Sequence, residues 1–179
     1  MTRHRRDVLK LGGGLLAALS LPAILRGAPS DAVAVVEMAG TARGEHVWFR
    51  PHGLHVNPGT LVRFVNRDAG NSHTATAYHP DLYGRSLRIP DAATPWDSGF
   101  LLPDAQFEVM LTVPGVYDYY CLPHEMAGMV GRIVVGRPTD AGWQGPVESA
   151  SDLPDAALNG FAPVDDILAQ GAIQQGGEP

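Results

Sequence analysis

The sequence predicts an all-β sandwich of about seven or eight short strands, and three observations lead to this fold class. Between residues 33 and 135, short β-branched or aromatic runs alternate with turn residues. Glycine (21) and proline (15) make up about a fifth of the 179 residues, with no collagen-like period. The chain is 45% hydrophobic and has a single cysteine, Cys121, so a packed core must stabilise the fold without intramolecular disulfides.

The expected strands follow from alternating side chains and from the turns between them. In chain order they are Val33–Met38, Val47–Arg50, Leu54–Val56, Leu61–Asn66, Thr74–Tyr78, Phe107–Val113, Val116–Tyr120 and Arg132–Val135. An Asn-Pro-Gly turn precedes the fourth strand, and Pro114 and Gly115 separate the sixth from the seventh. We expect neighbouring strands to pair antiparallel, as in a meander.

Two long segments lie outside this strand pattern. Residues 79–105 contain four prolines and several large apolar side chains. A loop of this length is either an ordered flap packed over the sandwich or a docking surface for a partner. Residues 137–179 are rich in Ala, Gly, Asp and Pro, with helix signals at Leu153–Leu158 and Val164–Gln170. We expect a C-terminal extension that wraps the sandwich or frays, not a second domain.

Residues 1–32 have the layout of a signal peptide. A basic N-terminal stretch precedes Leu11–Leu25, which is weakly apolar and, at 15 residues, short of the roughly 20 needed to span a membrane. Paired arginines followed closely by Val-Leu-Lys resemble the twin-arginine (Tat) export motif. Cleavage fits after Ala28 or Ala32. We therefore expect a periplasmic or otherwise extracytoplasmic protein, with no stable membrane span after removal of the signal.

The charge of the remaining chain argues against nucleic acid as a partner. Without residues 1–32 the chain has 8 basic and 17 acidic residues and no lysine, a net charge of about −9. Binding to a phosphate backbone uses clustered Lys and Arg, which this chain lacks. In an oxidising compartment the single thiol should be buried, or it should ligate something.

The residues that point most directly to chemistry are Cys121, His124 and Met129. A thiolate, an imidazole and a thioether suit copper in both oxidation states better than magnesium or calcium. A strand ending at Cys121 delivers its thiolate to the rim of the sandwich, and a turn stiffened by Pro123 brings His124 to the same metal. Gly128 lets the chain double back to Met129. One more imidazole completes a metal site; the alternative is that Cys121 is a buried, inert thiol.

The segment around these residues resembles the cupredoxins, specifically the plastocyanin-like group of small blue copper proteins. The residues that carry the resemblance are Tyr119, Tyr120, Cys121, Pro123, His124, Ala127, Gly128, Met129, Val130 and Gly131, followed by an apolar strand. The family's Pro-Gly-Thr turn is also present, as Pro58-Gly59-Thr60. The resemblance implies a cupredoxin-type Greek-key β-sandwich over residues 33–136, followed by the extension at 137–179.

The resemblance also implies the copper ligands. In the family the upstream histidine follows a strand and a short turn, which selects His73; His79 is the rival. One type 1 copper is then held by His73, Cys121, His124 and Met129. Met126 is a weaker axial candidate than Met129, since it lacks the preceding glycine.

The residues that support the copper ligands are expected to differ from the family pattern. The family usually places Asn after the upstream histidine, where it braces the cysteine loop, but this chain has Thr74. We expect the Thr74 hydroxyl or Asn71 to brace the loop instead. Tyr117 resembles the tyrosine that pins a Greek-key corner. His52 and His55 are expected in a surface loop.

The resemblance implies an electron carrier rather than an enzyme, with copper cycling between Cu(I) and Cu(II). The sequence has no evident nucleophile elbow, HExxH motif or phosphate loop. In the family the downstream histidine is the electron port, which here lies in an apolar patch of Leu122, Pro123, Met126 and Ala127 around His124. A redox partner such as a cytochrome or a terminal reductase or oxidase would dock there, steered by the acidic surface. The alternatives are copper storage or delivery, and an accessory domain of a copper oxidoreductase.

Overall fold

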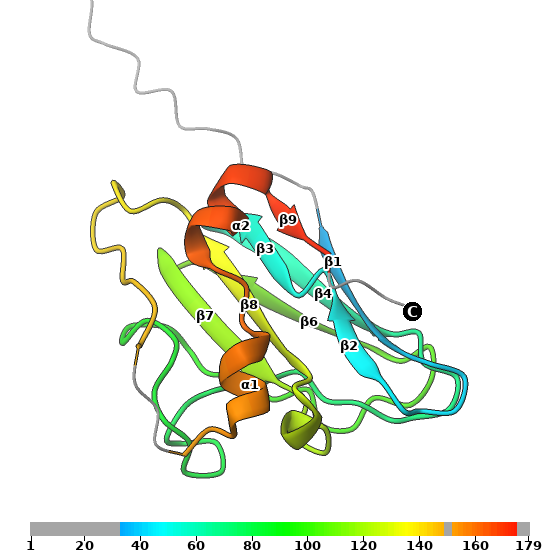
Figure 1. The fold of residues 1–179 in the computed structure, drawn as a ribbon. Coiled ribbons are helices and arrows are strands. Elements are labelled where there is room, and N and C mark those ends of the chain that lie inside the picture. Colours follow the sequence, from blue (N-terminus) through cyan, green and yellow to red (C-terminus); the bar gives the residue numbers. More distant parts are fainter. Residues whose placement is uncertain (1–32, 149–151, 175–179) are drawn as a thin grey trace, which may run out of the picture.

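The computed structural model describes residues 33–148 and 152–174, so the predicted signal peptide lies outside the described residues (Figure 1). The strands are β1 (Ala34–Gly40), β2 (Val47–Arg50), β3 (Gly53–Val56), β4 (Thr60–Asn66), β5 (Thr76–Ala77), β6 (Gln106–Leu111), β7 (Gly115–Tyr120), β8 (Val130–Val135) and β9 (Ala172–Ile173). The helices are the 3₁₀ helix η1 (Glu125–Ala127) and the α-helices α1 (Asp155–Gly160) and α2 (Val164–Gln170). Neither α-helix has the length and apolarity to cross a bilayer.

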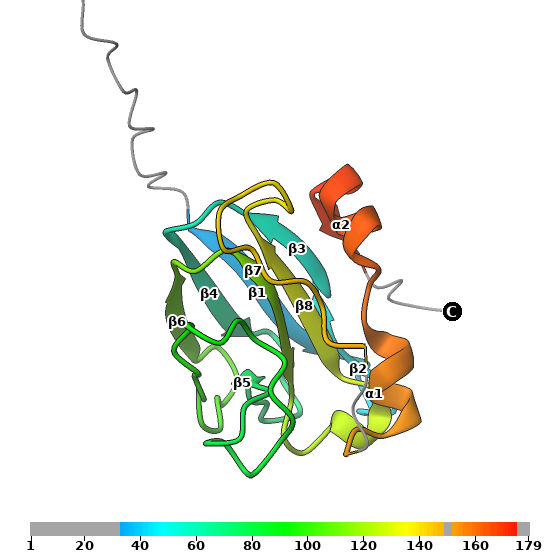
Figure 2. The same ribbon diagram turned by 90° about the vertical axis from the view of Figure 1, so that its left-hand side faces the viewer.

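The strands form two sheets, which confirms the predicted all-β sandwich. One sheet has the order β2-β1-β4-β6 and the other β5-β7-β8-β3-β9. The two sheets face each other (Figure 2), and the core residues lie between them. The expected meander is wrong across Pro114, because β6 and β7 lie in different sheets. Antiparallel pairing is also wrong at two places: β1 pairs parallel with β4, and β3 pairs parallel with β8. The cause is that β3 leaves the first sheet for the second, and β4 then returns beside β1. Alternation along one strand shows which side chains face inward but not which strand lies next to it.

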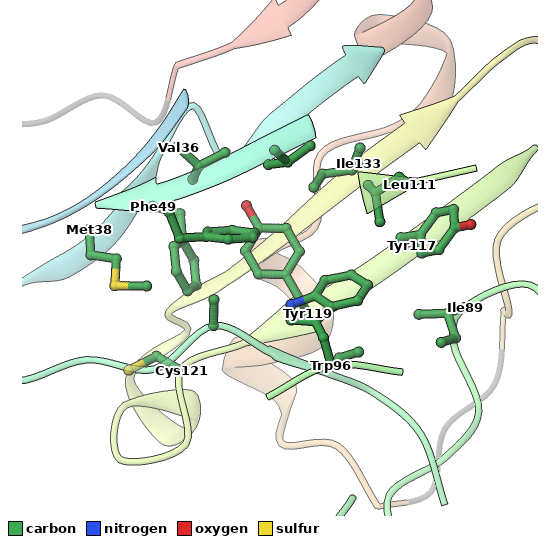
Figure 3. Packing of buried hydrophobic residues seen from close by; sticks show 14 of the residues in the cluster. Val36, Met38, Phe49, Ile89, Trp96, Leu111, Tyr117, Tyr119, Cys121 and Ile133 are labelled. Atoms are coloured by element: carbon green, nitrogen blue, oxygen red, sulfur yellow. The ribbon is translucent and has the colours of Figure 1, made fainter. Parts of the chain in front are cut away.

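An aromatic cluster occupies the centre of the core. The ring of Tyr119 contacts Phe49 and Phe64 edge to face, at centroid distances of 4.8 and 5.1 Å. Trp96, from the long connection between β5 and β6, stacks on Phe64. Its ring also lies beside that of Tyr119 (Figure 3). The connection also buries Ile89. It is therefore an ordered flap packed on the sandwich, while its use as a docking surface stays a prediction.

The C-terminal segment packs against the sheet that contains β7 and β8 (Figure 2). Each α-helix begins directly after a proline, whose fixed φ suits a helix start. Ile167 of α2 is fully buried against β3, where a Cβ on Gly53 would lie 2.8 Å from the Ile167 side chain. Only glycine lets the helix approach the strand so closely.

A buried ion cluster ties this segment to the sandwich. Asp118 of β7 accepts hydrogen bonds from Arg88 Nε (3.0 Å) and Arg132 Nε (2.7 Å). Both guanidinium groups lie 5.0 Å from the ring of Phe161, and Arg132 also donates to the carbonyl of Ala162. The linker between α1 and α2 is thus held by two cations that share one carboxylate.

Two further expectations concern single side chains. The hydroxyl of Tyr117 donates to the carbonyl of Val113 (2.7 Å), as expected for a tyrosine corner. His52 lies, half-buried, in the bend between β2 and β3, whereas the surface-loop expectation is wrong for His55. His55 lies in β3 with Nε2 3.0 Å from the Gly136 carbonyl, and the backbone N–H of His52 donates to Ile173 of β9. The two-residue strand β9, too short to be recognised in the sequence, covers this edge.

Candidate metal centre

The connection between β7 and β8 forms a compact loop that begins at Cys121. The backbone N–H of His124 donates to the Cys121 carbonyl (3.0 Å), and η1 continues the turn. Gly128 adopts φ of 79°, a left-handed conformation that reverses the chain. The N–H of Cys121 then donates to the carbonyl of Met129 (3.0 Å), and the N–H of Met129 donates to that of His124 (3.2 Å). These bonds hold the three residues predicted from the sequence in one rigid loop.

Three donor atoms converge at this end of the sandwich. The Nδ1 atoms of His73 and His124 lie 3.1 Å apart, and the Sγ of Cys121 lies 3.6 Å from the first and 3.4 Å from the second. Among the His, Cys, Asp and Glu side chains of residues 33–148 and 152–174, this is the one cluster with the spacing of a metal site. An ion bonded to three donors at about 2.0–2.3 Å requires them to be about 3.5 Å apart. The triangle therefore fits a single metal ion.

The rival residues lie outside this triangle. The Nδ1 of His79 accepts from the Asp81 backbone N–H (3.1 Å), and the ring takes no part in the donor cluster. The side chain of Met126 is 77% exposed, whereas that of Met129 is fully buried. Of the two upstream histidines, the structure thus brings His73 to the loop.

Burial sets the electrostatics of the donors. Burial raises the pKa of the Cys121 thiol to about 11, so the thiolate needs a positive ion beside it, and metal binding must release the proton. Burial and the neighbouring His73 lower the pKa of His124, which favours the neutral imidazole that binds metals. The Thr74 backbone N–H points at the sulfur (3.3 Å) and is ready to donate to a thiolate. A soft donor set of two imidazoles and a thiolate, enclosed in this way, suits copper.

Sequence reasoning missed the carboxylate beside His73. Asp68 Oδ2 lies 3.0 Å from His73 Nε2, and the Asp68 side chain is buried. Burial acts to raise the pKa of Asp68, but hydrogen bonds from Asn71, Gly70 and His73 outweigh it and hold the pKa below its usual range. The only available signal was an aspartate in the turn five residues before the histidine. Turn aspartates are common, so this signal was too general to single it out.

The Thr74 hydroxyl braces the cysteine loop, as one of the two expected alternatives. Its Oγ1 accepts from the backbone N–H of Leu122 (2.8 Å) and lies 2.9 Å from the Thr76 hydroxyl. Asn71 instead donates to Asp68 Oδ2 (2.8 Å). Thr74 therefore supports the cysteine loop, whereas Asn71 supports Asp68, which contacts His73.

A second unpredicted network fixes the outer side of the loop. The hydroxyl of Tyr78 donates to Glu125 of η1 (2.7 Å), and Arg85 pairs with the same carboxylate. The Arg85 guanidinium lies over the rings of Tyr78 and Tyr120, which stack on each other at 4.4 Å. These residues are far apart in sequence, so no local pattern signals the network.

Comparison with known proteins agrees with the fold and the site. Residues 36–136 match the family model of copper binding proteins, plastocyanin/azurin family. The chain is 31% identical over 137 residues to a chloroplastic plastocyanin of Hordeum vulgare, covering 75% of this chain and 85% of that protein. It is 32% identical over 130 residues to one of Pisum sativum, covering 73% and 74%. A pseudoazurin structure from Sinorhizobium aligns with TM-score 0.54 and 26% identity, covering 78% of this chain and 98% of that one.

The sandwich and its His-Cys-His cluster thus define a cupredoxin, which confirms the resemblance inferred from the sequence. The chain belongs to the plastocyanin/azurin family of copper-binding proteins. Its cofactor is copper, and it is an electron-transfer protein of the cupredoxin type.

Proposed function

We propose that this chain is an exported electron carrier with one type 1 copper, held by His73, Cys121, His124 and the axial Met129. The observation that carries the proposal is the triangle of donor atoms, with sides of 3.1 to 3.6 Å, assembled inside the sandwich. Met129 supports it, since its side chain is buried and its backbone is hydrogen bonded to both loop ligands.

The residues of the site have different roles in electron transfer. When bound, copper supplies a one-electron couple between Cu(I) and Cu(II). His73 and Cys121 are fully buried and exclude water from the site. Hydrogen bonds along the loop from Cys121 to Met129 keep the donors in place, so little rearrangement accompanies a change of charge. No substrate is turned over.

Electrons enter and leave through His124. Its ring is half-buried, and the neighbouring Pro123, Met126 and Ala127 are exposed. Leu122, also expected in this patch, is instead partly buried against the C-terminal segment. A redox partner, a cytochrome or a terminal reductase or oxidase, docks on this surface. The net charge of about −9 steers a basic partner, at rates that fall with added salt.

Export is supported by the basic and then apolar composition of residues 1–32 and by their paired arginines. The protein then works in the periplasm or another extracytoplasmic space.

A titration of the copper-free protein with Cu(II), followed by visible absorption and EPR, tests the site. We expect an intense thiolate-to-copper band that saturates at one copper per chain and is bleached reversibly by ascorbate. The band should be absent in Cys121→Ser and unchanged in the matched histidine control His79→Ala. Weak, colourless or multiple-site binding would contradict electron transfer and favour copper storage. A band lost in His79→Ala would overturn the assignment of His73.

A further inference from the structure

We propose that Asp68 is a positioning residue for the copper site, which fixes the orientation of His73 and lowers the reduction potential of the metal. This inference rests on the proposed copper site. Asp68 is not itself a ligand; its carboxylate contacts His73 at Nε2, the ring nitrogen that faces away from the donor cluster.

The geometry defines which nitrogen of His73 faces the metal. Asp68 Oδ2 lies 3.0 Å from Nε2, while Nδ1 faces His124 Nδ1 and Cys121 Sγ. An ionised carboxylate only accepts hydrogen bonds, so Nε2 carries the proton and the Nδ1 lone pair points into the donor triangle. The His73 side chain is completely buried, and Asp68 therefore selects one tautomer in a ring that water does not reach.

The fold builds a specific place for this carboxylate. Oδ2 accepts from Asn71 Nδ2 and Oδ1 accepts from the Gly70 backbone N–H, both at 2.8 Å. The backbone N–H of Asp68 donates to Asn66 Oδ1 (2.9 Å). Gly40 of β1 provides the space for this carboxylate, because a Cβ at that position would lie 2.2 Å from Asp68 Oδ2. The bond from Gly70 is that of an ordinary Asx turn, but a surface aspartate needs neither the bond from Asn71 nor the space at Gly40.

The charge of Asp68 is directed at His73. Within residues 33–148 and 152–174, Asp68 pairs with no Lys or Arg, and its Oδ2 is bonded to the His73 imidazole, whereas the buried Asp118 is neutralised by two arginines. A carboxylate bonded to the outer N–H of a ligating imidazole makes that imidazole a stronger donor. A buried negative charge that forms no ion pair with Lys or Arg in the described part of the chain also favours the more positive oxidation state. Both effects stabilise Cu(II) relative to Cu(I) and lower the potential.

The variant Asp68→Asn separates charge from shape, since asparagine has nearly the same size and keeps one accepting oxygen. We expect the Cu(II) affinity to fall about 10- to 100-fold, with a smaller change for Cu(I). A tenfold change in the ratio of the Cu(II) to the Cu(I) affinity corresponds to about 59 mV, so the potential should rise by at most about 60–120 mV. The readout is a redox titration of the thiolate-to-copper band. Asp104→Asn is the matched control, because that carboxylate is 83% exposed and pairs with Arg67.

The outcomes distinguish this inference from the site itself. A raised potential with the band retained supports the role of Asp68, and an unchanged potential with the band retained overturns it. A wild-type protein without the band contradicts the copper site, whatever Asp68 does.

If Asp68→Asn does not fold, NMR of the wild-type Cu(I) protein decides. We expect the His73 Nε2 proton to be shifted downfield and to exchange with water more slowly than that of His124. Exchange as fast as that of His124 overturns the proposal.

Discussion

Asp118→Asn should lower the free energy of unfolding by about 3–5 kcal/mol, the range seen when one partner of a buried ion pair is removed. Asp118 is fully buried, and it accepts from Arg88 Nε at 3.0 Å and from Arg132 Nε and Nη2 at 2.7 and 3.0 Å. The two arginines are 4% and 8% exposed. Asparagine removes the negative charge between them and can turn an NH₂ group towards a guanidinium.

This loss is large compared with the stability of a typical domain, about 5–15 kcal/mol. For a chain of this size, each kcal/mol corresponds to about 2–4 °C in Tm, so the melting temperature should fall by about 6–20 °C. Because Arg132 and Phe161 hold the linker between α1 and α2, residues 152–174 should also become more sensitive to protease.

The assay is guanidinium denaturation followed by circular dichroism, with wild type and variant in the same metal state. Glu108→Gln is the control, since Glu108 pairs with Arg63 where both side chains are more than a third exposed. Such surface pairs contribute about 0–1 kcal/mol. If the free energies of unfolding of Asp118→Asn and of this control differ by less than 1 kcal/mol, the two arginines do not depend on Asp118. That result would refute the reasoning about the buried cluster.

Two further predictions concern the metal loop. Met129→Leu should keep the thiolate-to-copper band and raise the reduction potential, because a weak axial donor to Cu(II) is lost; an unchanged potential in a redox titration would show that Met129 is not axial. Thr74→Val should cost about 1–3 kcal/mol in urea unfolding, because the N–H of Leu122 loses its acceptor. Thr74→Ser should restore most of this stability, and equal values for the two variants would contradict the bracing role.

The part of the site that lies in one stretch of chain was predictable. Cys121 and His124 sit on a connection between two adjacent strands, so their spacing in sequence determines their spacing in space. His73 could be predicted only from its position after a strand and a short turn. Asp68 and Arg85 were missed because their roles depend on which residues the tertiary fold places beside them.

The strands were predictable to within a few residues, but their partners were not. The inward-facing Val62 and Phe64 of β4 are fully buried, as alternation predicts. The parallel neighbour β1 could not be read from that pattern, because the crossover through β3 is a property of the whole chain. Likewise, the edge of β3 is covered by β9, whose two residues carry no periodicity.

The position of β3 also determines when the protein can fold. Its partners on either side, β8 and β9, are made long after β3 itself. Until β8 has been made, β3 therefore has no neighbour in the second sheet, and its other edge stays open until β9 has followed. Pairings between distant segments, parallel ones above all, place a protein among the slower-folding domains, in the range of milliseconds to seconds. The second sheet, and with it the loop that carries Cys121, can therefore pair fully only after β8 has been made.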